Sequence, residues 1–87
     1  MRAIITVVGK DMVGILAGVS TVCAKESVNV LEVTQSILQE FFCMVMLVDL
    51  SGASVTVPEL QKKIEEANPD MTIHVMHEDI FNSMHRI

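Results

Sequence analysis

The stretch from Gly9 to Leu16 constrains the fold most, because it joins two different residue periodicities. The residues before it, Ile4 to Val8, are apolar or β-branched and predict a strand. The residues after it carry apolar side chains at helical spacing, namely Ile15, Leu16, Val19, Val22 and Cys23. The sequence therefore predicts a strand that turns directly into a helix.

The chemistry of this turn leaves two explanations open for Gly14. Gly9 suits a sharp exit from the strand, and Asp11 is expected to cap the helix with its carboxylate. Gly14 then falls inside the first helical turn, where glycine is unfavourable. It allows either a close approach of the helix to the sheet, which Gly18 supports, or a close approach of a ligand. Free N–H groups at a helix start can bind a carboxylate or phosphate.

Periodicity along the rest of the chain predicts four strands, over 1–8, 30–39, 41–50 and 71–76, and three helices, over 13–26, 57–67 and 78–87. Asn29 is expected to form the turn after the first helix. The order βαββαβ with right-handed crossovers predicts an α+β, ferredoxin-like fold. Its four-stranded antiparallel sheet would carry two helices on one face. At 87 residues, we expect a single domain spanning 1–87.

The predicted strands differ in how much of their surface is apolar. The strand over 30–39 is half polar on both faces, which indicates a sheet edge or a partly solvated position. The strand over 41–50 is apolar on both faces, which is typical of a central strand covered on both sides. Two helices cover only one of those faces. We therefore expect the short C-terminal helix, or a second subunit, to cover the other.

Composition excludes several classes of partner. The formal net charge is −5, and Lys62-Lys63 is the one basic pair, so direct nucleic-acid binding is not expected. The apolar run from Phe41 to Val48 is too short to span a membrane as a helix. The N-terminal residues lack signal-peptide features, which favours a cytoplasmic location. Cys23 and Cys43 are expected to be free thiols in a reducing compartment.

No residue pattern predicts catalysis, a metal or a cofactor. His74 and His77 form an H-x-x-H beside two acids, but residues three apart on a strand point to opposite faces. The sequence also lacks the displayed aromatic residues with basic flanks of RNA-recognition domains, the C-x-x-C of copper chaperones and a first-loop arginine for acyl-phosphate hydrolysis. We expect a non-enzymatic protein.

The whole chain resembles an ACT domain, the small regulatory module of amino-acid metabolism. It is most similar to the stand-alone UPF0237 proteins, which are related to the ACT proteins that resemble the glycine cleavage system repressor. The resemblance rests on the segment 7–16, which matches strand, Gly-x-Asp-x-x-Gly-Ile/Leu, helix. It also rests on the Asn29-Val30 step and on the closing segment 78–87. One departure is Val13, where the commonest ACT pattern has proline.

The resemblance implies a homodimer or higher homo-oligomer that senses a small-molecule effector, with an amino acid as ligand. The implied ligand contacts are Asp11, Met12, Val13, Gly14, Ile15 and Asn29. Backbone N–H groups of 13–15 would bind a carboxylate, and the Asp11 or Asn29 side chain an amino group. A protein partner regulated by the sensor is compatible with this picture. The alternative is a ligand-free dimerisation or protein-interaction module.

Overall fold

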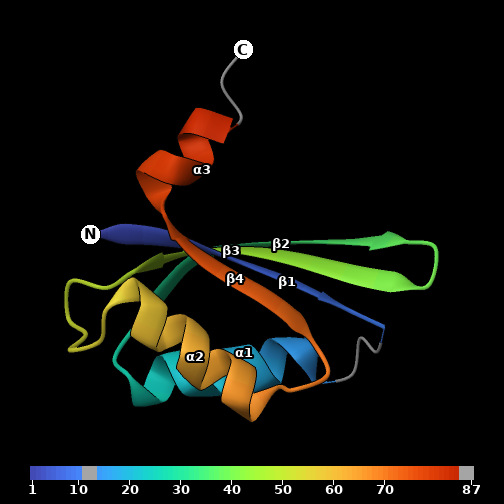
Figure 1. Cartoon of the computed structure of the whole chain (residues 1–87), viewed down its shortest axis with the longest axis horizontal. Helices are drawn as coiled ribbons and strands as arrows, with labels where there is room; N and C mark the ends of the chain where they lie inside the picture. Colours follow the sequence, from blue (N-terminus) through green and yellow to red (C-terminus); the bar gives the residue numbers. More distant parts are fainter. Residues whose placement is uncertain (11–13, 85–87) are drawn as a thin grey trace.

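A computed structural model describes residues 1–10 and 14–84 of the chain. The described part has the βαββαβ order followed by a short helix, as the sequence predicts (Figure 1). Helix α2 matches the predicted 57–67, β3 and α3 begin at the predicted residues, and the other ends that fall within the described residues differ by one or two residues. The elements are β1 (Arg2–Gly9), α1 (Ile15–Lys25), β2 (Asn29–Leu38), β3 (Phe41–Asp49), α2 (Val57–Ala67), β4 (Thr72–His77) and α3 (Glu78–Met84).

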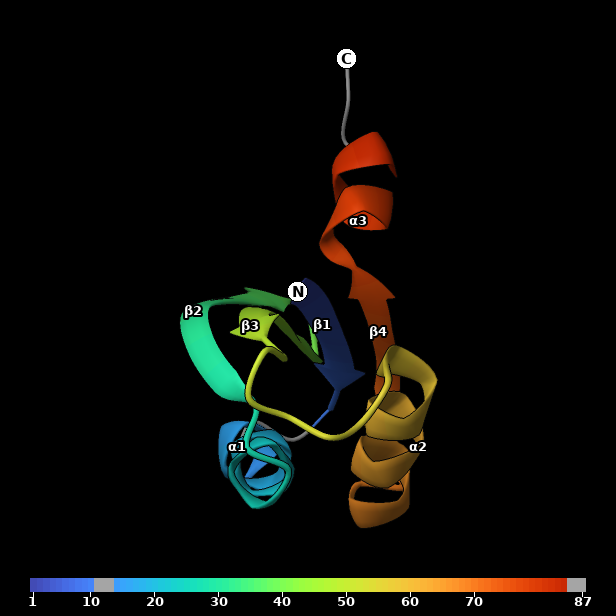
Figure 2. The same ribbon diagram turned by 90° about the vertical axis from the view of Figure 1, so that its left-hand side faces the viewer.

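The four strands form one antiparallel sheet in the order β2-β3-β1-β4. Helices α1 and α2 lie side by side against one face, and α3 lies on the opposite side (Figures 1 and 2). We call the face under α1 and α2 the inner face and the other the outer face. This is the ferredoxin-like arrangement that the sequence predicts.

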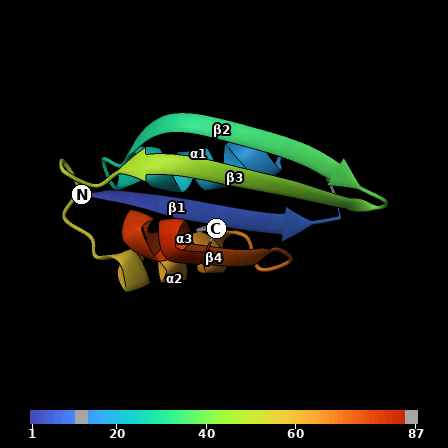
Figure 3. The ribbon, with the colours of Figure 1, turned by 90° about the horizontal axis from the view of Figure 1, so that it is seen from above.

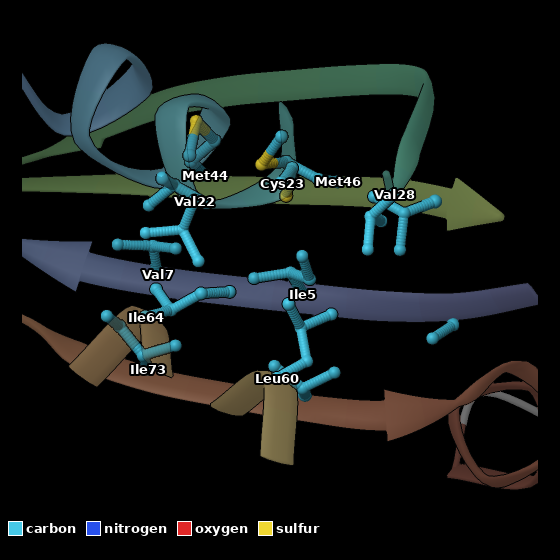
Figure 4. Packing of buried hydrophobic residues seen from close by; sticks show 14 of the residues in the cluster. Ile5, Val7, Val22, Cys23, Val28, Met44, Met46, Leu60, Ile64 and Ile73 are labelled. Atoms are coloured by element: carbon cyan, nitrogen blue, oxygen red, sulfur yellow. The ribbon is translucent and has the colours of Figure 1, made fainter. Parts of the chain in front are cut away.

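The hydrophobic core lies between the inner face and the two helices (Figure 4). Alternate residues of the central strands point into it, because side chains alternate between the faces of a strand. Ile5 of β1 lies opposite Met46 of β3 and Val75 of β4, and all three are buried. The helices contribute the buried side chains Ile15, Val19, Val22, Cys23, Leu60 and Ile64.

Strand β2 is an edge strand, as its polarity predicts. All of its residues except Val30 are exposed. A register shift between Val30 and Glu32 turns Val30 toward the inner face, where it packs against the core. The strand joins β3 through Gln39 and Glu40, with Gln39 in the left-handed region at φ 55°.

Helix α3 does not cover β3, contrary to the expectation for the C-terminal helix. Its main contacts are with β1 and β4, and Figure 3 shows it over that side of the sheet. The guanidinium of Arg2 donates to the Glu78 carboxylate and ties the start of α3 to β1. The outer side chains of β3, such as Val45 and Leu47, stay half-buried. Within the described ranges, no helix is long and apolar enough to cross a membrane.

Candidate functional site

Helix α1 begins at Ile15, and its N-cap residue is Gly14 in a left-handed conformation, at φ 85° and ψ −8°. The N-cap makes no side-chain hydrogen bond. The N-cap residue is therefore Gly14 rather than the predicted Asp11. Residues Asp11, Met12 and Val13, which the sequence proposes as ligand contacts, lie outside the described residues.

The glycines of this region have separate structural roles. A Cβ on Gly14 would meet nothing within 4 Å, so the positive φ, and not a close approach, favours glycine there. Gly18 provides the close approach, because a Cβ there would lie 2.1 Å from Oδ1 of Asn68. Gly9 is the last residue of β1, and a Cβ there would lie 3.2 Å from Cδ1 of Ile15. Helix packing and backbone angle thus account for all three.

A cleft of about 540 Å³ opens where β1 ends. Strand β1 lies between β3 and β4, so the chain leaves the sheet between two flanking strands when β1 stops at Gly9. The cleft therefore borders the glycine-bounded loop that the sequence singles out. Its lining comes from three separate parts of the chain, namely Val8, Gly9 and Lys10, then Phe41, then Asp70, Met71 and Thr72.

The cleft combines apolar walls with one cation and one anion. Val8 and Phe41 are large apolar side chains with exposed fractions of 37% and 36%. The Lys10 ammonium lies 6.0 Å from the Phe41 ring centroid, within reach of a cation–π contact. Asp70 supplies the carboxylate, and Thr72 supplies a hydroxyl. Apolar walls with a few polar groups are the usual lining of small-molecule sites.

Two other residues proposed from the sequence have clear positions. Ile15 is fully buried, so only its backbone is available to a ligand. Asn29 is exposed and pairs with Asp49 at one end of the sheet, whereas Gly9 pairs with Phe42 at the other end. The structure therefore does not bring Asn29 near Gly14 within one chain. Asn29 is also not the turn residue that the sequence predicts, because it begins β2 and Ser27 has the positive φ of 59°.

Sequence reasoning missed most of the cleft. Lys10 lies inside the glycine motif but has no assigned role there, and Phe41 counts only as the start of a strand. Asp70 is part of a helix-ending Asn-Pro-Asp segment. The sequence signal was Lys10, a lone cation inside a proposed anion-binding loop. The other residues are distant in sequence and meet only through the strand order.

Outside the cleft, the following ionisable side chains have structural roles. Among the residues that the structure describes, no group of three or more His, Cys, Asp or Glu side chains could hold a metal ion. Hydrogen bonds from Ser51 hold the pKa of Asp49 below its usual value. Burial raises the pKa of the Cys23 thiol, which makes it a poor nucleophile.

Comparison with known proteins gives a consistent result. A family model described as "ACT domain" matches residues 2–78. A UPF0237 protein of Clostridium acetobutylicum is 45% identical over the full length of both chains. The solved structure of an ACT domain protein from Streptococcus pneumoniae superposes with a TM-score of 0.81 at 36% identity, covering 93% of each chain. A putative glycine cleavage system transcriptional repressor shares the fold, with a TM-score of 0.61 at 21% identity over 85% of this chain and 43% of that one.

Proposed function

This chain belongs to the ACT domain family, and from that membership we propose that it is a regulatory sensor that binds an amino acid and acts as a homo-oligomer. Its similarity to UPF0237 proteins over the whole length supports residues 1–87 as a single domain. The observation that carries the proposal is the cleft at the end of β1, beside the loop of the family motif. We place the sensor in the cytoplasm and assign it no catalytic role.

The proposed contacts extend the cleft into the loop. The backbone N–H groups of Val13, Gly14 and Ile15 would bind a carboxylate, because the first N–H groups of a helix have no partner within it. The carboxylate of Asp11 would bind an amino group. A volume of about 540 Å³ falls within the range of small-molecule sites, roughly 300–1,000 Å³.

The two sheet edges support a homo-oligomer formed through β2. At the β4 edge, a side chain already occupies one backbone group: Gln61 accepts a hydrogen bond from the backbone N–H of Val75 at 2.9 Å. Strand β2 is ten residues long and carries Glu32 as its one charged residue, with no proline or lysine. Its exposed apolar side chains include Ile37 and Leu38, at 64% and 67% exposed. Such an edge is a ready template for pairing with another strand.

Antiparallel pairing of two β2 strands would also allow Asn29 of one copy to contact a ligand bound to the other. The strand ends at Leu38, which pairs with Phe41 near the cleft end of the sheet. In an antiparallel pair, the start of one strand lies beside the end of the other. The Asn29 of a second copy would then approach the loop after β1. A site shared between two copies is the arrangement that the family resemblance implies.

A thermal-shift screen against the twenty amino acids and a few nucleotides tests the sensor. The readout is an extrinsic dye, because the chain has no Trp or Tyr. A ligand at roughly 100 times its dissociation constant stabilises the folded state by about 2.7 kcal/mol, a clear shift for a domain of this size. We expect an amino acid to raise the melting temperature. If none of the compounds does, the sensor proposal is wrong.

A Gly14 substitution tests the loop as part of the site. We expect Gly14→Leu to abolish effector binding while oligomer assembly persists. Gly14→Asn is the matched control for backbone strain, because asparagine tolerates the left-handed region better than leucine does. Normal effector binding by the folded Gly14→Leu protein would remove this loop from the site.

The alternative is a ligand-free interaction module that docks on a partner protein or pairs with itself. It is favoured by the exposed apolar residues Val8 and Phe41 of the sheet and Ile80 of α3. A flat ligand screen together with a stable oligomer would support this function. Light scattering tests the oligomer in both cases, and a monomer at high protein concentration would contradict it.

A further inference from the structure

The strand registers determine which residues surround the cleft. Gly9 lies opposite Phe42 of β3, and Val8 lies opposite Thr72 of β4. Lys10 follows Gly9, Phe41 precedes Phe42 and Asp70 lies two residues before Thr72, and all three line the cleft. The cleft thus occupies the end of the sheet, with the cation in the middle and the anion on the β4 side.

Lys10 and Asp70 do not neutralise each other in this arrangement. The ion pairs among the described residues involve neither of them. The Lys10 ammonium lies over the Phe41 ring instead, on the β3 side. Two opposite charges therefore line the same cleft without forming a pair.

We infer that this cleft binds a zwitterionic amino acid with a long apolar side chain, and that two cleft residues add to the proposed loop contacts, Lys10 at the carboxylate and Asp70 at the ammonium. The inference rests on the proposed function and names the specificity-determining residues of its site. A zwitterion matches one cation and one anion held apart, whereas a phosphate would meet the Asp70 carboxylate as a repulsive neighbour. Charge-assisted hydrogen bonds to both groups would fix the ligand's orientation.

The apolar lining determines the side chain that fits. Val8 and Phe41 are exposed in the cleft, and Met71 at its base packs against the core. An apolar ligand side chain removes this surface from water, and methionine lining adapts to irregular shapes. A glycine ligand has no side chain to cover this apolar surface, which would stay exposed to water. An acidic ligand side chain would add a second negative charge near Asp70.

Isothermal titration calorimetry with L-leucine and L-methionine tests the inference. We expect Lys10→Met and Asp70→Asn each to weaken binding by about tenfold or more, because each removes one charge-assisted contact. Lys62→Met and Glu66→Gln are matched controls, since both residues are exposed on α2 and neither lines the cleft. They should leave binding unchanged. Glycine and L-aspartate should bind about tenfold or more weakly than L-leucine.

Ligand analogues separate direct recognition from an indirect structural effect. L-leucinamide lacks the carboxylate, so it should bind the wild type weakly and lose nothing further on Lys10→Met. N-acetyl-L-leucine lacks the ammonium, so it should bind the wild type weakly, and Asp70→Asn should not weaken its binding further. A substitution that merely disturbed the fold would weaken every ligand alike.

The outcomes distinguish this inference from the proposed function. Binding of a polar amino acid, or binding of L-leucine that is insensitive to both cleft substitutions, would overturn the inference and leave the sensor intact. Binding of a nucleotide instead would overturn both the inference and the amino-acid assignment. Absence of any ligand in the screen and the titrations would overturn the inference and the sensor together.

Discussion

Gly18 of α1 faces the buried amide of Asn68 at the end of α2, and the two helices meet at this point. A Cβ on Gly18 would lie 2.1 Å from Oδ1 of Asn68, far inside contact distance. The amide cannot move freely, because Asn68 is 8% exposed and its Nδ2 donates to the carbonyl of Ile64 at 3.0 Å. One small residue thus sets how closely the helices pack.

Gly18→Ala should lower the free energy of unfolding by about 1 kcal/mol. Displacing the Asn68 amide costs about 1–3 kcal/mol if its hydrogen bond breaks, and the better helix propensity of alanine returns up to about 1 kcal/mol. Urea denaturation measures the difference. In an Asn68→Ala background the obstruction is gone, so the same Gly18→Ala change should become stabilising. If Gly18→Ala still lowered the free energy of unfolding in the Asn68→Ala background, the assigned contact would be wrong.

Gly14 tests a different kind of glycine requirement. Its φ of 85° is unfavourable for an L side chain, although a Cβ would meet nothing within 4 Å. Gly14→Ala should therefore lower the free energy of unfolding by about 1 kcal/mol through backbone strain alone. Gly14→Asn should cost clearly less, because asparagine tolerates this conformation. Chemical denaturation of the two variants compares them, and equal losses would point to a steric cause.

Local signals predicted the fold well where they were strong. Helix α2 was predicted to the residue, because Pro58 marks its start and Asn68-Pro69 its end. The N-cap of α1 was missed because Asp11 offers a good capping side chain, whereas the chain uses the left-handed angle of Gly14. Left-handed residues are hard to predict when they are not glycine, and Ser27 shows this.

The candidate site was harder to predict because it is assembled by tertiary structure. The loop before α1 was identified from the glycine spacing, but the cleft residues come from three distant segments. The position of α3 likewise depends on Arg2 and Glu78, which are 76 residues apart in sequence. No local periodicity carries such information. The strand order supplies it, through the registers that set β1 between β3 and β4.

The capping box of α2 should make stability depend on pH. The Glu59 carboxylate accepts from the backbone N–H of Thr56 at 2.8 Å, and this hydrogen bond holds the pKa of Glu59 below its usual value. A carboxyl whose pKa is lowered by folding stabilises the fold above its unfolded pKa, about 4.3. That contribution is lost as the pH falls through the lower folded pKa.

Glu59→Gln should therefore cost stability at pH 7 and cost less as the pH falls below about 4. Urea denaturation at a series of pH values measures this convergence with the wild type. Glu66→Gln, an exposed change on the same helix, is the matched control. Thr56→Ala removes the other half of the box and should cost about 0.5–2 kcal/mol. A constant effect of Glu59→Gln across this range would contradict the assignment.

The two cysteines should differ in reactivity toward N-ethylmaleimide. Cys23 is 1% exposed and burial raises its thiol pKa, whereas Cys43 is half-buried on the outer face. Cys43 should react roughly tenfold faster or more in the folded protein, because reaction needs an accessible thiolate. Mass spectrometry of Cys23→Ser and Cys43→Ser proteins assigns the rates. In urea, where both thiols are exposed, the two rates should become similar. Equal rates in the folded state would contradict the burial of Cys23.

The contact between Arg2 and Glu78 should hold α3 against the sheet without contributing much to global stability. Nε of Arg2 lies 2.7 Å from Oε2 of Glu78, and the Arg2 side chain is half exposed. Exposed ion pairs contribute little to stability, so Arg2→Met should hardly change the free energy of unfolding. Hydrogen exchange should show the larger effect, with faster exchange confined to α3.

Lys62→Met, which removes an exposed cation from α2, should leave exchange in α3 unchanged. Ile4 provides a second readout, because it is 6% exposed on the outer face, where α3 contacts β1. Loosening of α3 should expose Ile4, and binding of a hydrophobic dye to the Arg2→Met protein should rise. If exchange in α3 matches the wild type, the ion pair does not hold the helix and its apolar contacts with β1 and β4 suffice.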